Sequence, residues 1–260
     1  MERVERLGKI IAVANQKGGV GKTTTAVNLS ACIAARDKRV LLVDLDPQGN
    51  ASSGLGRGGQ QEHTVYDVLI GEADASESVL DTDCAGLRLL PTAIELAGAE
   101  IELVGVDDRE LLLKGALEDV RADYDYIFID CPPSLSLLTV NALSAADSVL
   151  IPIQCEYYAL EGLGQLMNTI KLMRKKLNPS LGIEGILLTM FDARTNLCAQ
   201  VVQEVRAHFP SEVFETMIPR NIRLSEAPSY GMPIHLYDGR CIGAKAYGEL
   251  ARELIERNGV

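Results

Sequence analysis

Short apolar runs alternate with longer stretches of helical periodicity along this chain. Runs typical of strands occupy residues 10–14, 40–43, 87–90, 126–129, 148–153, 185–190 and 214–218. Stretches typical of helices occupy residues 24–36, 65–70, 95–102, 107–122, 136–145, 159–177, 197–208 and 243–257. Strands that alternate with helices predict right-handed βαβ units and a mostly parallel sheet. We therefore expect an α/β fold with a doubly wound, mostly parallel sheet flanked by helices.

The composition agrees with a buried parallel sheet. Aromatic residues make up only 5% of the 260 residues and tryptophan is absent, so the core must consist of Val, Ile, Leu and Ala. The length suits one large α/β domain or two small ones. No internal repeat is present, and the glycine-rich stretch at residues 54–61 is interpreted as a surface connection. We expect a single domain over residues 1–260.

Charge, cysteines and the chain ends restrict the class of protein further. The net charge of -11 does not suggest a protein coated in nucleic acid, although a local basic patch is compatible with it. The six cysteines are scattered without a C-x-x-C pair, which favours reduced thiols over a zinc or iron–sulfur site. The short, charged N-terminus is unlike a signal peptide, and no run is long enough to span a bilayer. We expect a cytoplasmic protein without membrane attachment.

A glycine-rich segment between the first strand and the first helix indicates the chemistry. It consists of Lys17, Gly18, Gly19, Val20, Gly21, Lys22, Thr23 and Thr24. Glycines let backbone N–H groups approach phosphate oxygens, and the following helix points its positive end to the same place. In this interpretation Lys22 reaches the terminal phosphates and the Thr23 hydroxyl binds Mg²⁺. The alternative, a turn with two solvated lysines, is disfavoured by the strand–loop–helix context.

Aspartates follow two of the predicted strands directly. Asp44 and Asp46 come after one strand, and Asp130 ends another. Ligands of an open parallel sheet bind beyond the carboxyl ends of its strands, so these carboxylates are candidates for holding Mg²⁺ or the attacking water. Ordinary turn aspartates are the alternative. The neighbouring phosphate loop favours the functional interpretation, with Thr23, Asp46 and Asp130 at the metal.

The loop departs from the general phosphate-loop pattern in a specific way. Gln16 stands where that pattern has its first glycine, and Lys17 is a second lysine five residues before Lys22. With residues 44–50 and 129–133, this loop resembles the ParA/Soj family of partition ATPases, within the group of P-loop NTPases that includes MinD and the nitrogenase iron protein. Residues 154–162 and 218–228 are also similar. The resemblance extends over about residues 9–256 and points to the chromosomal Soj-like branch.

The resemblance implies a mechanism. Mg-ATP closes two subunits face to face with the nucleotides between them, and Lys17 reaches the nucleotide of the partner subunit. Lys22 binds the β- and γ-phosphates, Asp46 positions the attacking water, and Asp130 acts on Mg²⁺. Hydrolysis is slow, and a ParB-type centromere-binding protein stimulates it through a short basic peptide. The adenine base is expected near Met190, Pro219, Arg220 and Asn221.

The resemblance also implies a DNA surface. The ATP-bound homodimer of such proteins binds double-stranded DNA without sequence preference and so associates with the nucleoid. Arg194 and Arg223 match the family's DNA contacts, and this chain carries Met232 where many relatives have a lysine. Such backbone contacts weaken as salt rises. Arg220, Arg240 and Lys245 are further candidates, for which an exposed, solvated side chain is the favoured interpretation.

Other classes of function remain as alternatives. MinD-like membrane attachment needs a basic amphipathic C-terminal helix, whereas residues 249–260 are amphipathic without net positive charge. A metabolic P-loop enzyme needs a substrate pocket of its own, and no histidine lies in a recognisable motif. An electron-transfer role needs a second cysteine ligand beside Cys131. A regulator that only binds nucleotide is disfavoured by the intact Lys22, Asp46 and Asp130.

Overall fold

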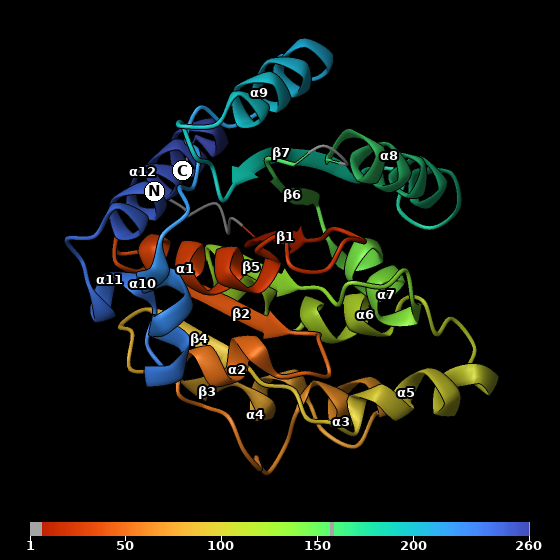
Figure 1. Cartoon of the computed structure of the whole chain (residues 1–260). Coiled ribbons are helices and arrows are strands. Elements are labelled where there is room, and N and C mark those ends of the chain that lie inside the picture. Colours follow the sequence, from red (N-terminus) through yellow and green to blue (C-terminus); the bar gives the residue numbers. More distant parts are fainter. Residues whose placement is uncertain (1–6, 157–158, 260) are drawn as a thin grey trace, which may run out of the picture.

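The sheet lies at the centre of the computed structural model, which describes residues 7–156 and 159–259 (Figure 1). Tyr157 and Tyr158, part of one stretch quoted for the resemblance, lie outside the described residues, as do residues 1–6 and Val260. The described strands form one seven-stranded sheet in the order β3-β4-β2-β5-β1-β6-β7. Their bounds are β1 (Lys9–Val13), β2 (Val40–Asp44), β3 (Leu80–Asp81), β4 (Leu87–Leu90), β5 (Tyr126–Asp130), β6 (Ser148–Gln154) and β7 (Gly182–Thr189).

All neighbouring strands pair in parallel except β3, which runs antiparallel to β4. The doubly wound α/β fold predicted from the sequence is therefore confirmed. The antiparallel β3 was not predicted, because two residues are too short to give a periodic signal.

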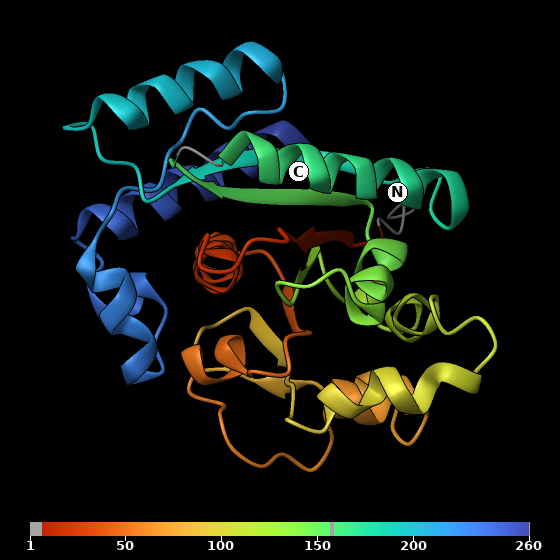
Figure 2. The same ribbon diagram turned by 45° about the vertical axis from the view of Figure 1, so that its right-hand side comes forward.

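Helices cover both faces of the sheet (Figures 1 and 2). On one face α1 and α12 pack together over buried side chains such as Leu29 and Leu250, and on the other α6 to α9 bury side chains such as Leu143 and Leu163. The α-helices are α1 (Lys22–Ala34), α2 (Asn50–Gly54), α3 (Val65–Ile70), α4 (Ala75–Ser78), α5 (Leu96–Glu102), α6 (Leu112–Glu118), α7 (Leu137–Ala145), α8 (Ala159–Lys176), α9 (Asn196–His208), α10 (Ile222–Glu226), α11 (Ile234–Tyr237) and α12 (Ile242–Asn258). None of the helices in the described part of the chain has the length and apolar character needed to cross a membrane.

The register of the sheet brings the candidate residues to one edge. Val13, the last residue of β1, pairs with Asp130, and Asp44 at the end of β2 pairs with the same Asp130 from the other side. The segment after β1, the end of β2 and the end of β5 therefore meet at the carboxyl edge of the sheet, where parallel sheets bind ligands.

The predicted strand at residues 214–218 is wrong. Phe214 and Ile218 each donate a backbone hydrogen bond to β7, but Glu215 and Thr216 donate theirs to the carboxylate of Glu253 on α12, at 2.8 and 3.0 Å. A side chain from a distant helix therefore interrupts the ladder, and no local pattern announces it.

The predicted helix at residues 107–122 is too long. Helix α6 begins only at Leu112, after residues 107–110 form turns. Asp108 adopts a φ of 52°, in the left-handed region, and such a residue interrupts a right-handed helix.

Candidate active site

The glycine-rich segment leaves β1 and enters α1 as an open loop. Gly19 and Gly21 have φ values of 74° and 87°, which favour glycine because other residues are strained there. Gly21 is the N-cap of α1 and provides no side-chain cap, so the first N–H groups of the helix are available to an anion. The Thr189 hydroxyl donates to the Val20 carbonyl at 2.8 Å and holds the loop against the sheet. The loop thus has the geometry of a phosphate cradle.

The two lysines of the loop lie in different surroundings. Lys22 is only 7% exposed and donates to the Lys17 carbonyl at 3.2 Å. Burial lowers the pKa of Lys22, and the carboxylate of Asp130 opposes that shift. Lys17 lies at the rim, where its Nζ pairs with Glu156 at 3.0 Å. Lys22 is therefore placed for a ligand inside the loop, and Lys17 for one that arrives from outside.

Asp44 and Asp130 form a buried pair of carboxylates. Asp44 Oδ2 accepts hydrogen bonds from the backbone and the hydroxyl of Ser52, both at 2.7 Å, and burial raises the pKa of Asp44 to about 6. Neither carboxylate oxygen of Asp130 has a hydrogen-bond partner in the described part of the chain. Burial, and after it the charge of Asp44, raises the pKa of Asp130 well above its usual range. The nearby Thr23 hydroxyl lowers that pKa in part without reaching hydrogen-bond geometry.

The two oxygens of Asp130, which lack hydrogen-bond partners among the described residues, and the neighbouring Asp44 carboxylate fit a divalent cation. The residues described contain no ready-made cluster of three His, Cys, Asp or Glu side chains that could hold a metal. Mg²⁺ needs no such cage, because it keeps several waters and takes one or two carboxylates together with phosphate oxygens. The donor set of Thr23 and Asp130 matches that requirement.

Asp46 lies at the start of a tight turn. Its Oδ1 accepts from the Gln48 backbone at 3.0 Å, and its carbonyl accepts from the Gly49 backbone at 2.9 Å. Asp46 therefore forms an aspartate turn, which was the alternative interpretation of this residue from the sequence. Oδ2 of Asp46 makes no hydrogen bond to any described residue, and the carboxylate raises the pKa of Lys22 through its charge. One oxygen therefore fixes the turn while the other is available beside the loop.

The four residues expected at the adenine base line one cavity of about 260 Å³ next to the phosphate loop. Two segments of the chain meet at this cavity, the one after β7 and the one that contains Arg220. They are joined by a hydrogen bond from the Arg220 backbone to the Phe191 carbonyl at 3.1 Å. The sequence did not reveal the other lining residues, because they come from distant elements that only the tertiary fold brings here. The lining is Gly21, Thr24, Thr189, Met190, Ile218, Pro219, Arg220, Asn221, Leu224, Ser225, Pro228 and Tyr247.

The two candidate DNA-binding arginines occupy neighbouring segments. Arg194 follows β7 and pairs with Asp192 at 2.7 Å, and Arg223 on α10 pairs with Glu226 at 2.8 Å. The segments are linked by a bridge between Phe191 and residue 219. Both guanidinium groups are exposed, and exposed ion pairs contribute little, so a phosphate can replace the carboxylate.

The site combines a strand, a glycine loop and a helix with a buried lysine and with aspartates at the carboxyl edge of the sheet. This combination defines a P-loop nucleotide-binding protein. Comparison with known proteins agrees: the AAA domain family matches residues 8–183. The sporulation initiation inhibitor protein Soj of Bacillus subtilis is 61% identical over 249 residues, 95% of this chain and 98% of that protein. The chromosome partitioning protein ParA of Myxococcus xanthus is 56% identical over 255 residues, 97% of this chain and 89% of that protein.

A solved structure extends the comparison. Cobyrinic acid a,c-diamide synthase from Mycobacterium smegmatis, with a bound ATP analogue and magnesium, superposes with a TM-score of 0.85 at 39% identity and covers 98% of each chain. The chain belongs to the ParA/Soj family of chromosome-partitioning ATPases. The resemblance, the P-loop fold and the ATPase class predicted from the sequence are confirmed.

Proposed function

We propose that this chain is an ATP-driven switch for DNA segregation that acts in the cytoplasm and associates with the nucleoid when ATP is bound. Mg-ATP joins two copies of a single domain into a dimer, the dimer binds DNA, and slow hydrolysis of ATP to ADP and phosphate resets it. The observation that carries the proposal is the nearly buried Lys22 inside an open glycine loop, beside the orphaned carboxylate of Asp130.

The nucleotide is held by the loop and by the cavity next to it. The backbone N–H groups of residues 18–24 surround the phosphates, and Lys22 neutralises their charge at low solvent exposure, where a charge interaction is strong. The adenine base occupies the cavity lined by Met190, Pro219, Arg220 and Asn221. Phosphoryl transfer needs positioning and charge neutralisation more than covalent chemistry, and these residues supply both.

Thr23, Asp46 and Asp130 complete the reacting part of the site. Thr23 and Asp130 would hold Mg²⁺, and the ion would supply positive charge to the phosphate oxygens. The free oxygen of Asp46 orients the attacking water, and Asp46 is also available to the metal through a water molecule. Asp44 keeps the segment after β2 in place through its two hydrogen bonds from Ser52.

Dimerisation and DNA binding follow from groups at the rim. Lys17 leaves Glu156 and reaches the nucleotide of the partner subunit, as an arginine finger does. Arg194 and Arg223 exchange their carboxylate partners for DNA phosphates, and a dimer doubles these contacts on one surface. A ParB-type centromere-binding protein stimulates hydrolysis.

The test is DNA co-sedimentation of the Asp46→Ala protein with ATP, with ADP and without nucleotide, at low and moderate salt. Binding only with ATP, weaker at higher salt, supports the switch. Binding that is equal in all three states contradicts it. A parallel Lys22→Ala protein should bind no ATP, and tight ATP binding by that variant would refute the phosphate-loop assignment.

Two alternatives have less support. The solved neighbour from Mycobacterium smegmatis is named for a biosynthetic synthase, but the partitioning relatives are more similar, at 61% and 56% against 39% identity. Membrane attachment through the C-terminal helix is disfavoured, because α12 buries Tyr247, Leu250 and Leu254 on the domain.

A further inference from the structure

Two buried thiols meet at the carboxyl edge of the sheet. Cys155 directly follows the last residue of β6, and Cys198 lies in the first turn of α9, 43 positions further along the chain. The two residues are 4% and 6% exposed, both thiols are free, and neither lines the adenine cavity. The Cys198 thiol donates to the Cys155 carbonyl at 3.5 Å, so the first turn of α9 is in direct contact with the end of β6.

The two sulfur atoms are also close to each other. Burial raises the pKa of Cys155 to about 12, and the Cys198 thiol, within hydrogen-bonding reach of the Cys155 thiol, adds to that shift. Two thiols held side by side can join within one molecule, at an effective concentration that a second molecule does not match. Another pair of buried cysteines is less close, because Cys32 acts on the pKa of Cys84 through its charge and not through a hydrogen bond.

A reagent can reach the pair through the end of a helix. Buried cysteines usually act as small apolar side chains, and their thiols react slowly. Here α9 lies at the outside of the fold beyond β7, and Leu197, next to Cys198, is 43% exposed (Figure 1). Helix ends open locally at little cost, and opening of the first turn of α9 exposes the Cys198 sulfur. In reducing compartments, disulfides that do form are usually transient and respond to redox conditions.

Each cysteine is next to a residue that the proposed function uses. Glu156 directly follows the first of them and pairs with Lys17 at 3.0 Å. The Thr195 hydroxyl accepts from the Cys198 backbone at 3.4 Å and so caps α9 directly after Arg194. A bond between the two sulfurs therefore joins the segment that holds Lys17 to the segment that carries Arg194.

We propose that Cys155 and Cys198 are a redox-sensitive pair, which a small disulfide such as oxidised glutathione converts into an intramolecular disulfide, and that this bond hinders ATP-dependent dimerisation. First the Cys198 thiol loses its proton and attacks one sulfur of the reagent, and one thiol leaves. Then the Cys155 thiol loses its proton and attacks the Cys198 sulfur of the mixed disulfide, and the second thiol leaves. The protein loses two hydrogen atoms, and the reagent is reduced to two thiols.

The effect on dimerisation rests on the proposed function, because it assumes that Lys17 leaves Glu156 when two subunits close on ATP. The disulfide forms in the arrangement that contains this ion pair, so it stabilises that arrangement against one in which the end of β6 moves. Linkage is reciprocal: if the disulfide disfavours the ATP-bound dimer, ATP disfavours the disulfide by the same factor. Formation of the disulfide itself depends neither on dimerisation nor on ATP hydrolysis.

The chemistry is tested first, on the wild-type protein without nucleotide. The protein is equilibrated with glutathione buffers of rising oxidised fraction, the remaining thiols are alkylated, and the intact mass and the tryptic peptides are measured. We expect a species with two alkylated cysteines fewer than the reduced protein, in which the peptides of Cys155 and Cys198 are cross-linked. The variant Cys32→Ala/Cys84→Ala should form the same bond, and the variant Cys155→Ala/Cys198→Ala should form none.

Several results overturn the redox-sensitive pair. They are no oxidation of the folded protein at any glutathione ratio, glutathione adducts without a cross-link, or a bridge that involves other cysteines. The peptide map of the wild-type protein decides among them, so the conclusion stands even where a variant fails to fold.

Dimerisation is measured separately, by sedimentation with an ATP analogue that is not hydrolysed. Oxidised wild type should dimerise severalfold more weakly than reduced wild type, a reductant should restore it, and Cys155→Ala/Cys198→Ala should dimerise equally under both conditions. The analogue should shift the redox midpoint of the pair toward the thiols by the same factor. Equal dimerisation of the oxidised and reduced proteins keeps the disulfide and overturns the coupling. A reduced protein that binds the analogue but never dimerises contradicts the proposed function and leaves the disulfide intact.

Discussion

The ion pair between Lys17 and Glu156 predicts that removing the glutamate favours the ATP-bound dimer. If Lys17 must reach the partner subunit's nucleotide, it first has to leave Glu156, 3.0 Å away in the structure described here. The variant Glu156→Gln weakens that pair while keeping the size of the side chain. The closed dimer then forms without the cost of breaking it.

The magnitude follows from the exposure of the pair. The side chains of Lys17 and Glu156 are 38% and 46% exposed, and pairs of this kind contribute about 0.2–1 kcal/mol. A dimer breaks two of them, so the free energy of dimerisation should become more favourable by up to ~2 kcal/mol, and the dissociation constant should fall about 30-fold at most. Because water and salt screen such a pair, the difference should shrink as ionic strength rises.

The assay is sedimentation of the protein with ATP over a range of concentrations, in the Asp46→Ala background so that the nucleotide stays intact. Glu161→Gln is the matched control, because Glu161 is an exposed acid on the nearby α8. Glu161→Gln should dimerise like the parent, and Lys17→Ala should not dimerise. A Glu156→Gln protein that dimerises more weakly than the parent would show that Glu156 helps the dimer, and the reasoning would fail.

Three further predictions concern DNA, pH and stability. Arg194→Glu with Arg223→Glu should keep the ATP dimer and lose DNA binding at moderate salt; DNA binding that survives places the surface elsewhere. Because burial raises the pKa of Asp44 from 3.8 to about 6, the folded, metal-free protein loses stability as pH rises through that interval, when the unfolded chain has already released the proton. Asp44→Asn should therefore raise the melting temperature without Mg²⁺ more at pH 7.5 than at pH 5, and an equal effect at both contradicts the assignment. Glu253→Ala strands the backbone N–H groups of Glu215 and Thr216 and should lower the free energy of unfolding by about 1–3 kcal/mol in urea titration, whereas Glu249→Ala should change it little.

The phosphate loop and the aspartates were predictable because their signals are local. The apolar run at residues 10–14 predicts a strand, and the residues from Lys17 to Thr24 predict a turn with positive φ and the start of a helix. Parallel pairing then places Asp44 and Asp130 side by side. The edge of the sheet that holds the ligands thus follows from the parallel orientation of the strands, which repeated strand–helix units predict.

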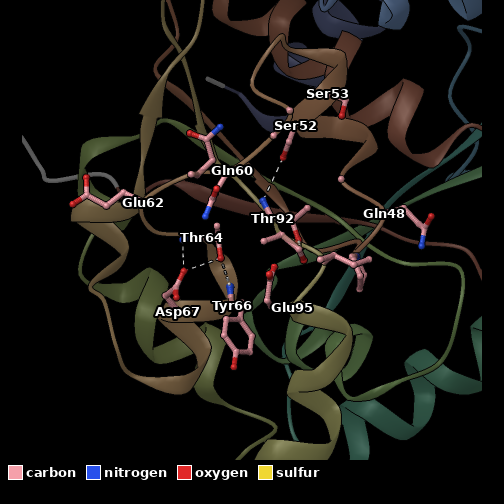
Figure 3. Close-up of a pocket in the computed structure, with 17 residues that line it drawn as sticks. Gln48, Ser52, Ser53, Gln60, Glu62, Thr64, Tyr66, Asp67, Thr92 and Glu95 are labelled. Atoms are coloured by element: carbon pink, nitrogen blue, oxygen red, sulfur yellow. Dashed lines mark hydrogen bonds between the residues drawn. The ribbon is translucent and has the colours of Figure 1, made fainter.

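What the sequence did not reveal depends on contacts between distant segments. Glu253 reaches residues 215 and 216 from α12 and replaces the ladder of a predicted strand. Ser52 binds Asp44, and Thr92 binds Ser52 (Figure 3), although 40 positions separate them in the chain. The partner of a side chain across the fold cannot be read from spacing, because it depends on how helices pack on the sheet.

The charges of the site explain why magnesium and nucleotide should act together as a switch. Without a cation, Asp44 and Asp130 cannot both ionise cheaply, since burial raises the pKa of each and the charge of Asp44 raises the pKa of Asp130 further. The nearly buried Lys22 provides one positive charge for three nearby carboxylates, those of Asp44, Asp46 and Asp130. A Mg²⁺ ion alone meets the carboxylates but lacks the phosphate oxygens that complete its coordination, and the phosphates alone add negative charge to an acidic site. Magnesium and the phosphates therefore supply ligands and charge to each other at this site, and under the proposed function part of their joint binding free energy would bring Lys17 and a second subunit into place.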